Sequence, residues 1–381
     1  MRLRGIAFVF LFFAMLCYPL WGRYIGRNVT LSGVTLTTDQ PELSWSGIWT
    51  GEYQSQSNTH YEETFEGRNL LIKLRSQLLY SVFNESPNEN VVIGKDQYLY
   101  DPAYILQELS AEDHVATDEY FADLKSRLLA FQQLLSEKGK ELYIFVTPNK
   151  AYYEKEEIPW NYRMLETDEV NNITRLRAML ETTDLHYLIA RDYIDAERET
   201  MDVPVFYSTG IHWSRPWGAR SAMALYDVMR QNSRFELSDI ALETYPYSGE
   251  IEWPDADLYQ SLNLFEEPDE SYYSARIHVT REGEKPNVFC RGGSFLGQSW
   301  SMLVQSGCFS NDLHYENNYF FTNQYTTQTT LSVMAAYEES DEWIPFLRDA
   351  DIVVLEINEA SIEDATFGFV DYVLDHSEIL N

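Results

Sequence analysis

The sequence has few cysteines and few basic residues, and both shortages limit what the protein can do. Only 3 of its 381 residues are cysteine, and its Cys and His residues show no zinc-binding spacing. It has 28 Lys and Arg against 60 Asp and Glu, a formal net charge of −32. A chain this acidic repels phosphodiester backbones, so nucleic acid is excluded as a partner. The sequence also lacks a phosphate-binding loop and a dinucleotide fingerprint, so we expect neither a metal nor a cofactor.

The cysteine positions predict that the fold is stabilised without disulfides. Cys290 ends an apolar run, and Cys308 lies about 14 residues along the helix predicted to start at Ser294, roughly 20 Å away at a rise of 1.5 Å per residue. A disulfide needs Cα atoms about 4.4–6.8 Å apart. We therefore expect two free, buried thiols and a substantial core, in keeping with 45% hydrophobic residues.

A long hydrophobic run occurs only at the N-terminus. Arg2 and Arg4 precede an apolar run from Ile6 to Trp21, and no small-residue cleavage site follows it. This pattern favours a retained signal-anchor and an extracytoplasmic domain, although a spanning helix needs about 20 residues. The predicted organisation is a membrane signal-anchor at 1–26, a stalk and N-terminal segment at 27–68 and the main domain at 69–381.

The main domain alternates predicted helices with predicted strands. An amphipathic helix over 118–137 precedes the apolar strand Leu142–Val146, and the last strand, Ile352–Leu355, is also continuously apolar. Strands without polar alternation are typical of a parallel sheet that helices cover on both faces. The sequence therefore predicts an α/β fold with a doubly wound, mostly parallel sheet. The acidic stretch 236–284 interrupts the alternation, and we interpret it as an inserted lid region.

Ser294 lies where a predicted strand meets a predicted helix. The apolar run Asn287–Cys290 leads to Gly292 and Gly293, which permit a sharp turn, and the helix begins at Ser294. Backbone N–H groups at a helix start can stabilise an oxyanion. Ser294 is therefore a candidate nucleophile and Gly293 a candidate oxyanion donor. The alternative is that Ser294 only caps the helix.

His212 is the candidate general base. It is one of 7 histidines and lies in the aromatic segment 205–214, just before a predicted helix that starts at Gly218. A base must be held rigidly beside the hydroxyl it deprotonates, and Trp213 and Trp217 could hold it or line a sugar-binding groove. The alternative is that His212 only completes a hydrogen-bond network.

Four blocks of the sequence follow one another in the order found in a known family. They are 46–82, Val91–Tyr100, Leu142–Lys150 with Tyr153, and the pair His212 and Ser294. In these blocks the chain resembles the SGNH-hydrolase-like O-acetyltransferases of the alginate-acetylation type, which are described by the motif Asp-His-His-Trp.

The resemblance implies a fold, a reaction and partners. It implies an SGNH hydrolase-like fold and acetyl transfer to hydroxyls of an exported cell-envelope polysaccharide, through an acetyl-enzyme on Ser294 with His212 as base. A membrane-bound O-acyltransferase would supply the acetyl groups, and Asn323 could add an oxyanion donor. We expect the side chains of His212 and Ser294 within about 4 Å of each other. A carbohydrate acetylesterase and a catalytically weak glycan-binding or scaffold subunit are the alternatives.

Two positions depart from the family pattern. The family has an acid two residues before the histidine, where this chain has Gly210, and an acid can precede its serine, where this chain has Gly293. In a serine triad the acid orients the imidazole and stabilises the imidazolium. Asp202 and Glu356 are candidate replacements, and a backbone carbonyl could also fix the ring. If a carbonyl does so, Gly210→Asp should raise turnover.

Overall fold

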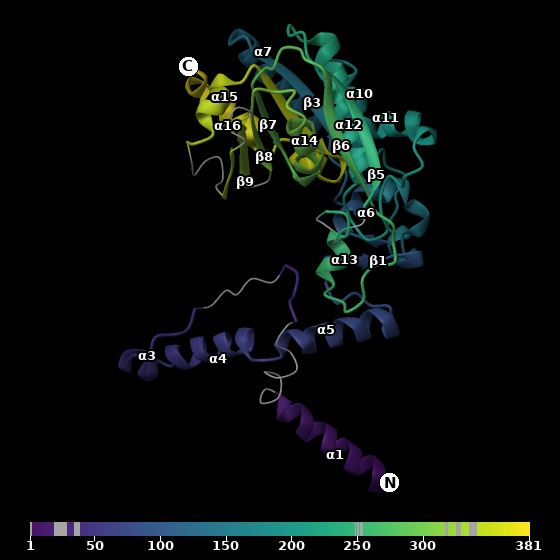
Figure 1. Cartoon of the computed structure of the whole chain (residues 1–381), viewed down its shortest axis with the longest axis vertical. Helices are drawn as coiled ribbons and strands as arrows, with labels where there is room; N and C mark the ends of the chain where they lie inside the picture. Colours follow the sequence, from purple (N-terminus) through teal and green to yellow (C-terminus); the bar gives the residue numbers. More distant parts are fainter. Residues whose placement is uncertain are drawn as a thin grey trace. The chain divides into compact units, whose positions relative to one another are not determined.

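The structure is a computed structural model whose chain divides into two compact units (Figure 1). One unit comprises residues 1–93 with 257–269, and the other comprises residues 94–256 with 270–381. The predicted boundaries at residues 26 and 68 both fall within the first unit. The structure describes residues 2–18, 29–33, 39–247, 249, 251, 254–316, 319–324, 329–334 and 341–381.

The first unit is mainly helical. Left-handed glycines, Gly51 at φ 82° and Gly67 at φ 87°, precede two of its helices. The Lys73 ammonium donates to the Leu264 carbonyl at 3.1 Å, which joins the segment 257–269 to the preceding helices. The elements are α1 (Arg2–Leu16), α3 (Trp45–Thr50), α4 (Glu52–Thr64), α5 (Arg68–Leu78), the π-helical turn η1 (Leu79–Phe83), β1 (Val92–Ile93) and α13 (Asp257–Ser261).

The N-terminal helix was predicted to anchor the chain in a membrane. Within the described part of the chain, no helix is both long enough and apolar enough to span a membrane. Helix α1 has 15 residues, about 22 Å at 1.5 Å per residue, against a hydrocarbon core of about 30 Å. Residues 19–28, which include part of the predicted signal-anchor over 1–26, lie outside the described residues, so the anchor stays a prediction.

The second unit is built on a seven-stranded sheet of order β10-β9-β8-β7-β11-β3-β4 (Figure 1). The five strands from β8 to β4 run parallel, whereas β9 and β10 are antiparallel to their neighbours. This arrangement confirms the predicted doubly wound, mostly parallel sheet. The strands are β3 (Glu141–Thr147), β4 (His186–Ile189), β7 (Val288–Gly292), β8 (Asn311–Glu316), β9 (Tyr319–Gln324), β10 (Thr329–Met334) and β11 (Ile352–Asn358).

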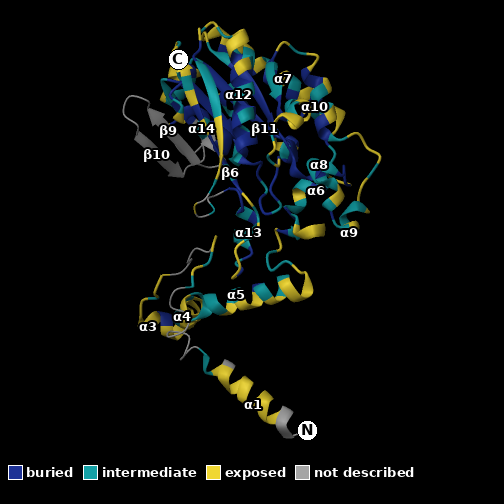
Figure 2. Cartoon of the chain, turned by 45° about the vertical axis from the view of Figure 1, so that its right-hand side comes forward, coloured by how far each residue is buried: buried dark blue, intermediate teal, exposed yellow. Residues whose placement is uncertain are grey.

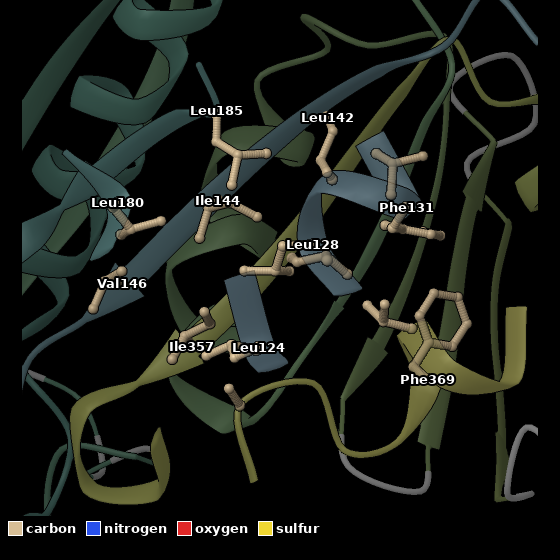
Figure 3. Close-up of a cluster of buried hydrophobic side chains, with 14 of the residues drawn as sticks. Leu124, Leu128, Phe131, Leu142, Ile144, Val146, Leu180, Leu185, Ile357 and Phe369 are labelled. Atoms are coloured by element: carbon tan, nitrogen blue, oxygen red, sulfur yellow. The ribbon is translucent and has the colours of Figure 1, made fainter. Parts of the chain in front are cut away.

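Helices cover both faces of this sheet, because strands such as β3 have apolar side chains on both faces. Leu142, Ile144 and Val146 pack into one core cluster, shown with α7 in Figure 3, while Tyr143 and Phe145 pack into the cluster on the opposite face. Both faces are therefore buried, as the central blue strands of Figure 2 show. One face carries α7 (Asp118–Glu137), α10 (Asn172–Leu180), α15 (Ile344–Asp349) and α16 (Phe369–Asp375), and the other carries α11 (Ala190–Glu197), α12 (Arg215–Asn232) and α14 (Ser294–Gln305).

The acidic stretch 236–284 contains more regular structure than its sequence predicted. Strands β5 (Asp239–Pro246) and β6 (Tyr273–Arg281) pair antiparallel within it. Ala275 and Ile277 of β6 are buried against the cluster that includes α12 and α14, so part of the insertion belongs to the core. Its role as a lid stays a prediction. The remaining short elements are η2 (Lys95–Gln97), β2 (Leu99–Tyr100), α6 (Pro102–Glu108), α8 (Lys150–Tyr153), η3 (Lys155–Glu157), α9 (Trp160–Arg163), η4 (Arg198–Thr200), η5 (Glu359–Asp364) and η6 (Ser377–Leu380).

Both cysteines of the second unit are free and buried. Cys290 lies in β7, and Cys308 follows α14, which ends at Gln305. Burial raises the pKa of Cys290 well above its ordinary value and raises the pKa of Cys308 to about 12. Since the thiolate is the reactive form, both thiols are chemically quiet.

Candidate active site

The candidate nucleophile lies on a tight turn between β7 and α14. Strand β7 ends at Gly292 and α14 begins at Ser294, with Gly293 as its N-cap. A Cβ at Gly292 would lie 2.4 Å from Glu356 Oε2 and 2.6 Å from Glu356 Cβ, so a side chain there would displace Glu356. The predicted strand, glycine turn and helix are thus confirmed. The interpretation of Ser294 as a mere N-cap is wrong, because that position belongs to Gly293.

A buried carboxylate supports this turn from the neighbouring strand. Glu356 lies near the end of β11, next to β7, and is 2% exposed. Its Oε2 accepts the Gly293 N–H at 2.5 Å, and its Oε1 accepts the Thr147 hydroxyl at 2.6 Å. The Gly293 N–H is therefore engaged in the fold. It could serve as the predicted oxyanion donor only by leaving Glu356.

The candidate base lies on an irregular segment before α12. A single β-bridge joins Phe206 to Trp213, on either side of the turn that contains His212. The Ser214 N–H donates to the Val205 carbonyl at 2.7 Å, and this hydrogen bond joins the two ends of the segment 205–214. His212 is 4% exposed, so its ring is held inside the domain.

The fold brings these two halves together. His212 Nε2 and Ser294 Oγ are 2.7 Å apart and form a hydrogen bond, although 82 positions separate the residues in sequence. This distance confirms the expected approach within about 4 Å. The His212 ring also packs on Phe295, with ring centroids 4.7 Å apart. Ser294 itself is half-buried.

Residues 91–265 match the family described as the SGNH hydrolase-like domain of the acetyltransferase AlgX. Over these residues the chain is similar to that family. The match includes His212 and ends before Ser294, so it does not itself cover the nucleophile turn. No curated protein matches the chain.

Three solved structures are similar to this chain at low identity. The O-acetyltransferase domain of Pseudomonas putida AlgJ is 15% identical, with 76% of this chain and 99% of that chain covered and a TM-score of 0.44. Pseudomonas aeruginosa AlgX is 14% identical, with coverage of 74% and 67% and a TM-score of 0.40. Bacillus cereus PatB1 with a sulfonyl adduct is 10% identical, with coverage of 72% and 96% and a TM-score of 0.42.

The two tryptophans near the candidate base belong to the core of the second unit. Trp213 and Trp217 are both fully buried. Trp213 packs against Phe145 of β3, and the Trp217 indole N–H donates to the Val203 carbonyl at 2.9 Å. Their predicted contact with substrate is therefore wrong, because side chains without exposed surface cannot touch a glycan. They hold the segment that carries His212.

The other residues predicted for the site are Asn323, Asp202 and Glu356. Asn323 lies in β9, and its side chain is outside the described part of the structure. Asp202 is exposed, and the Glu356 carboxylate holds Gly293 and Thr147. The group that orients the far side of the His212 ring stays a prediction. Within the described ranges, no group of three or more His, Cys, Asp or Glu could hold a metal ion.

Gly210 occupies the position of the family acid for a steric reason. A Cβ at Gly210 would lie 2.6 Å from the Asp255 carbonyl oxygen and 3.1 Å from the Pro254 carbonyl oxygen. These are backbone atoms and cannot rotate away as a flexible side chain could. The expectation that Gly210→Asp restores a family acid is therefore incompatible with the structure. The sequence shows that the family acid is absent. It does not show that the backbone of Pro254 and Asp255 occupies the space where its side chain would lie.

Sequence reasoning missed Lys150, a fully buried lysine beside the candidate base segment. Its ammonium lies within 3.0 Å of four backbone carbonyls, three of them in residues 207–210. The available signal was its position three residues after the apolar strand β3. A lysine is almost never fully buried unless its charge is compensated.

A second buried charge cluster supports the start of α8. Arg191 forms ion pairs with Glu359 and Glu108. The Asn149 N–H donates to Glu359 Oε2 at 3.2 Å. Burial raises the pKa of Glu359 to about 7, although Arg191 opposes the rise. This cluster lies under the backbone that carries Lys150.

Proposed function

We propose that the chain is an O-acetyltransferase that uses Ser294 as nucleophile and His212 as general base. The observation that carries the proposal is the 2.7 Å contact between His212 Nε2 and Ser294 Oγ. A general base acts at about 2.6–3.2 Å from the proton that it takes, and the contact falls in this range. The family description as an acetyltransferase supports the same chemistry.

In the first half of the reaction, Ser294 Oγ attacks the acetyl carbonyl and its proton passes to His212 Nε2. The bond from the carbonyl carbon to the leaving oxygen then breaks, and that oxygen takes the proton from His212. The product is an acetyl ester on Ser294. The Ser294 N–H at the start of α14 is placed to stabilise the intermediate oxyanion, with Gly293 as a second donor if it leaves Glu356.

In the second half, a hydroxyl of the acceptor gives its proton to His212 and attacks the acetyl-enzyme. The ester bond to Ser294 breaks, and Ser294 Oγ takes the proton back. We propose a cell-envelope polysaccharide as acceptor, outside the cytoplasm, and a membrane-bound O-acyltransferase as the source of acetyl groups. Attachment through residues 1–26 stays a prediction. The support for these partners is the family likeness.

The test is acetyl release from a chromogenic ester by wild type and Ser294→Ala. Loss of the nucleophile should lower turnover by up to roughly 10⁶-fold. Ser301→Ala is the matched control, because Ser301 lies in the same helix and its hydroxyl bonds only the Gln298 carbonyl at 3.0 Å in the described structure. A sulfonyl fluoride should label Ser294, with the adduct located by mass spectrometry. Equal turnover of wild type and Ser294→Ala would end the proposal.

Adding an acceptor oligosaccharide to the assay distinguishes acetyl transfer from hydrolysis of the acetyl-enzyme. Acetylated oligosaccharide in the product, dependent on Ser294, supports the transferase. Release of acetate alone, with every acceptor offered, supports the acetylesterase alternative. Glycan binding without any Ser294-dependent turnover supports the scaffold alternative.

A further inference from the structure

Lys150 has an unusual set of partners for a buried lysine. Its Nζ lies 2.7 Å from the carbonyl oxygens of Leu99, Tyr207 and Gly210, and 3.0 Å from that of Ser208. Moving an ammonium out of water is costly unless fixed dipoles replace the water. The four carbonyls provide these dipoles. A hydrophobic side chain of similar length would fill the same space but leave the carbonyls unsatisfied.

The backbone of Lys150 is itself firmly placed. Lys150 follows β3, which lies inside the sheet between β11 and β4. The Asn149 side chain accepts the Ala151 N–H at 2.8 Å and caps α8, whose first residue is Lys150. The Asn149 N–H donates to Glu359. Lys150 thus links the centre of the sheet to the segment 207–210.

That segment has no strand ladder to fix its direction. Lys150 donates to three of its carbonyls, and the Leu99 N–H of β2 donates to the Ser208 carbonyl at 2.8 Å. The Thr209 hydroxyl donates to the Asp255 carbonyl at 3.3 Å, and the Tyr207 hydroxyl accepts the Tyr273 N–H at 2.8 Å. Glu270 accepts the Ser208 N–H at 3.0 Å and the Thr209 hydroxyl at 2.9 Å. Buried irregular backbone must find such partners. The last residue held by Lys150 is Gly210, two positions before His212.

We propose that Lys150 is a positioning residue for the candidate base. Its ammonium fixes the backbone of 207–210 and so keeps His212 Nε2 within hydrogen-bond distance of Ser294 Oγ. The inference rests on the proposed function for its kinetic consequence, but its structural consequence stands alone. Without the ammonium, the four carbonyls turn toward other donors and the histidine segment moves.

The test compares Lys150→Met, Lys150→Arg and the control Lys155→Met in the full chain. Met keeps the length and removes the charge. Arg keeps the charge, but its planar guanidinium cannot collect four carbonyls around one nitrogen. Lys155 lies five positions away and pairs with Glu166 at the surface, so its loss matches the change in composition without touching the segment.

For Lys150→Met we expect a kcat about 100-fold below wild type with KM within about twofold, because a small misplacement of a catalytic group can cost this much. Lys155→Met should match wild type. Sulfonylation of Ser294 should slow in parallel, measured on protein shown to be folded by circular dichroism. A folded Lys150→Met with wild-type kcat overturns the proposal. If Lys150→Met does not fold, Lys150→Arg decides: a kcat at least about tenfold lower supports the proposal, and a wild-type kcat overturns it.

A crystal structure of the variant that folds separates this inference from the proposed function. We expect the distance from His212 Nε2 to Ser294 Oγ to exceed about 3.5 Å, the limit of a hydrogen bond. An unchanged contact overturns the positioning role, whatever the activity. If wild type shows no Ser294-dependent turnover, the acetyltransferase proposal fails, and this distance alone still tests Lys150.

Discussion

The two halves of the candidate site are held by opposite charges. The serine half is a regular connection from β7 to α14, and a buried carboxylate, Glu356, takes a backbone N–H from its turn. The histidine half is an irregular segment, and a buried ammonium, Lys150, takes its backbone carbonyls. In each half, the buried charge forms hydrogen bonds with backbone groups that no strand ladder pairs.

Two unlike pieces of chain thus form one catalytic pair, and each has its own kind of support. A turn into a helix exposes N–H groups, which an acid satisfies. A buried loop outside the sheet exposes carbonyls, which a cation satisfies. Both anchors lie near the ends of adjacent parallel strands, Lys150 three residues after β3 and Glu356 in β11. The sheet therefore sets the distance between His212 and Ser294 through two buried charges.

On the serine side, the largest effect of a change to the support of the turn is expected from Glu356→Gln. The amide can still accept one hydrogen bond, but it loses a charge-assisted bond to the Gly293 N–H, so the nucleophile turn loosens. Ser294-dependent turnover should fall roughly 10- to 100-fold. The free energy of unfolding should fall by about 2 kcal/mol, measured by urea denaturation.

Glu363→Gln is the control for this change, since Glu363 is an exposed carboxylate soon after β11. A Glu356→Gln variant faster than wild type would contradict the comparison. It would show that the Glu356 carboxylate hinders catalysis, because its bond to the Gly293 N–H keeps this donor from the oxyanion, and that the carboxylate is not needed to support the turn.

A smaller effect is expected from filling the space at Gly210. Gly210→Ala would press a Cβ against the Asp255 carbonyl, 2.6 Å away, and displace the histidine segment. We expect a loss of about 1–3 kcal/mol in unfolding free energy and a fall in turnover of roughly tenfold. Gly210→Asp should be no better than Gly210→Ala. A Gly210→Asp variant more active than wild type would show that the backbone at 254–255 gives way and that the family acid can be rebuilt.

The serine half of the site could be predicted from sequence because its signals are local. An apolar strand, two glycines and an amphipathic helix follow one another, and the structure places β7 and α14 within two residues of the expected bounds. The sheet was predictable for the same reason, since the continuously apolar β3 and β11 require cover on both faces. Trp213 and Trp217 were misinterpreted because aromatic residues mark a core as often as a binding groove.

The supports of the histidine half have no comparable signature. Lys150 bonds carbonyl oxygens, which every residue has, so neither its partners nor its burial can be read from side-chain types. Gly210 looks like a lost acid in the sequence, whereas the structure shows a position closed by the backbone at 254–255. Contacts between distant backbone segments depend on the completed fold, and no local pattern encodes them.

The smallest effect on turnover is expected from Glu359, in the buried charge cluster beneath Lys150. The protonation of Glu359 should change the stability of the folded protein with pH. Burial raises the pKa of Glu359 from 4.5 to about 7, so the folded state binds a proton that the unfolded state releases between these values. The stability that this proton contributes is present below about pH 4.5 and is lost as pH rises toward and through 7. Relative to Glu359→Gln, wild type should therefore lose roughly 5 °C in unfolding midpoint between pH 5 and pH 8. Thermal melts of both proteins across this range test the sign. A wild type that gains stability relative to Glu359→Gln over the same interval would mean that Arg191 keeps Glu359 ionised, and that the histidine half rests on fixed charges alone.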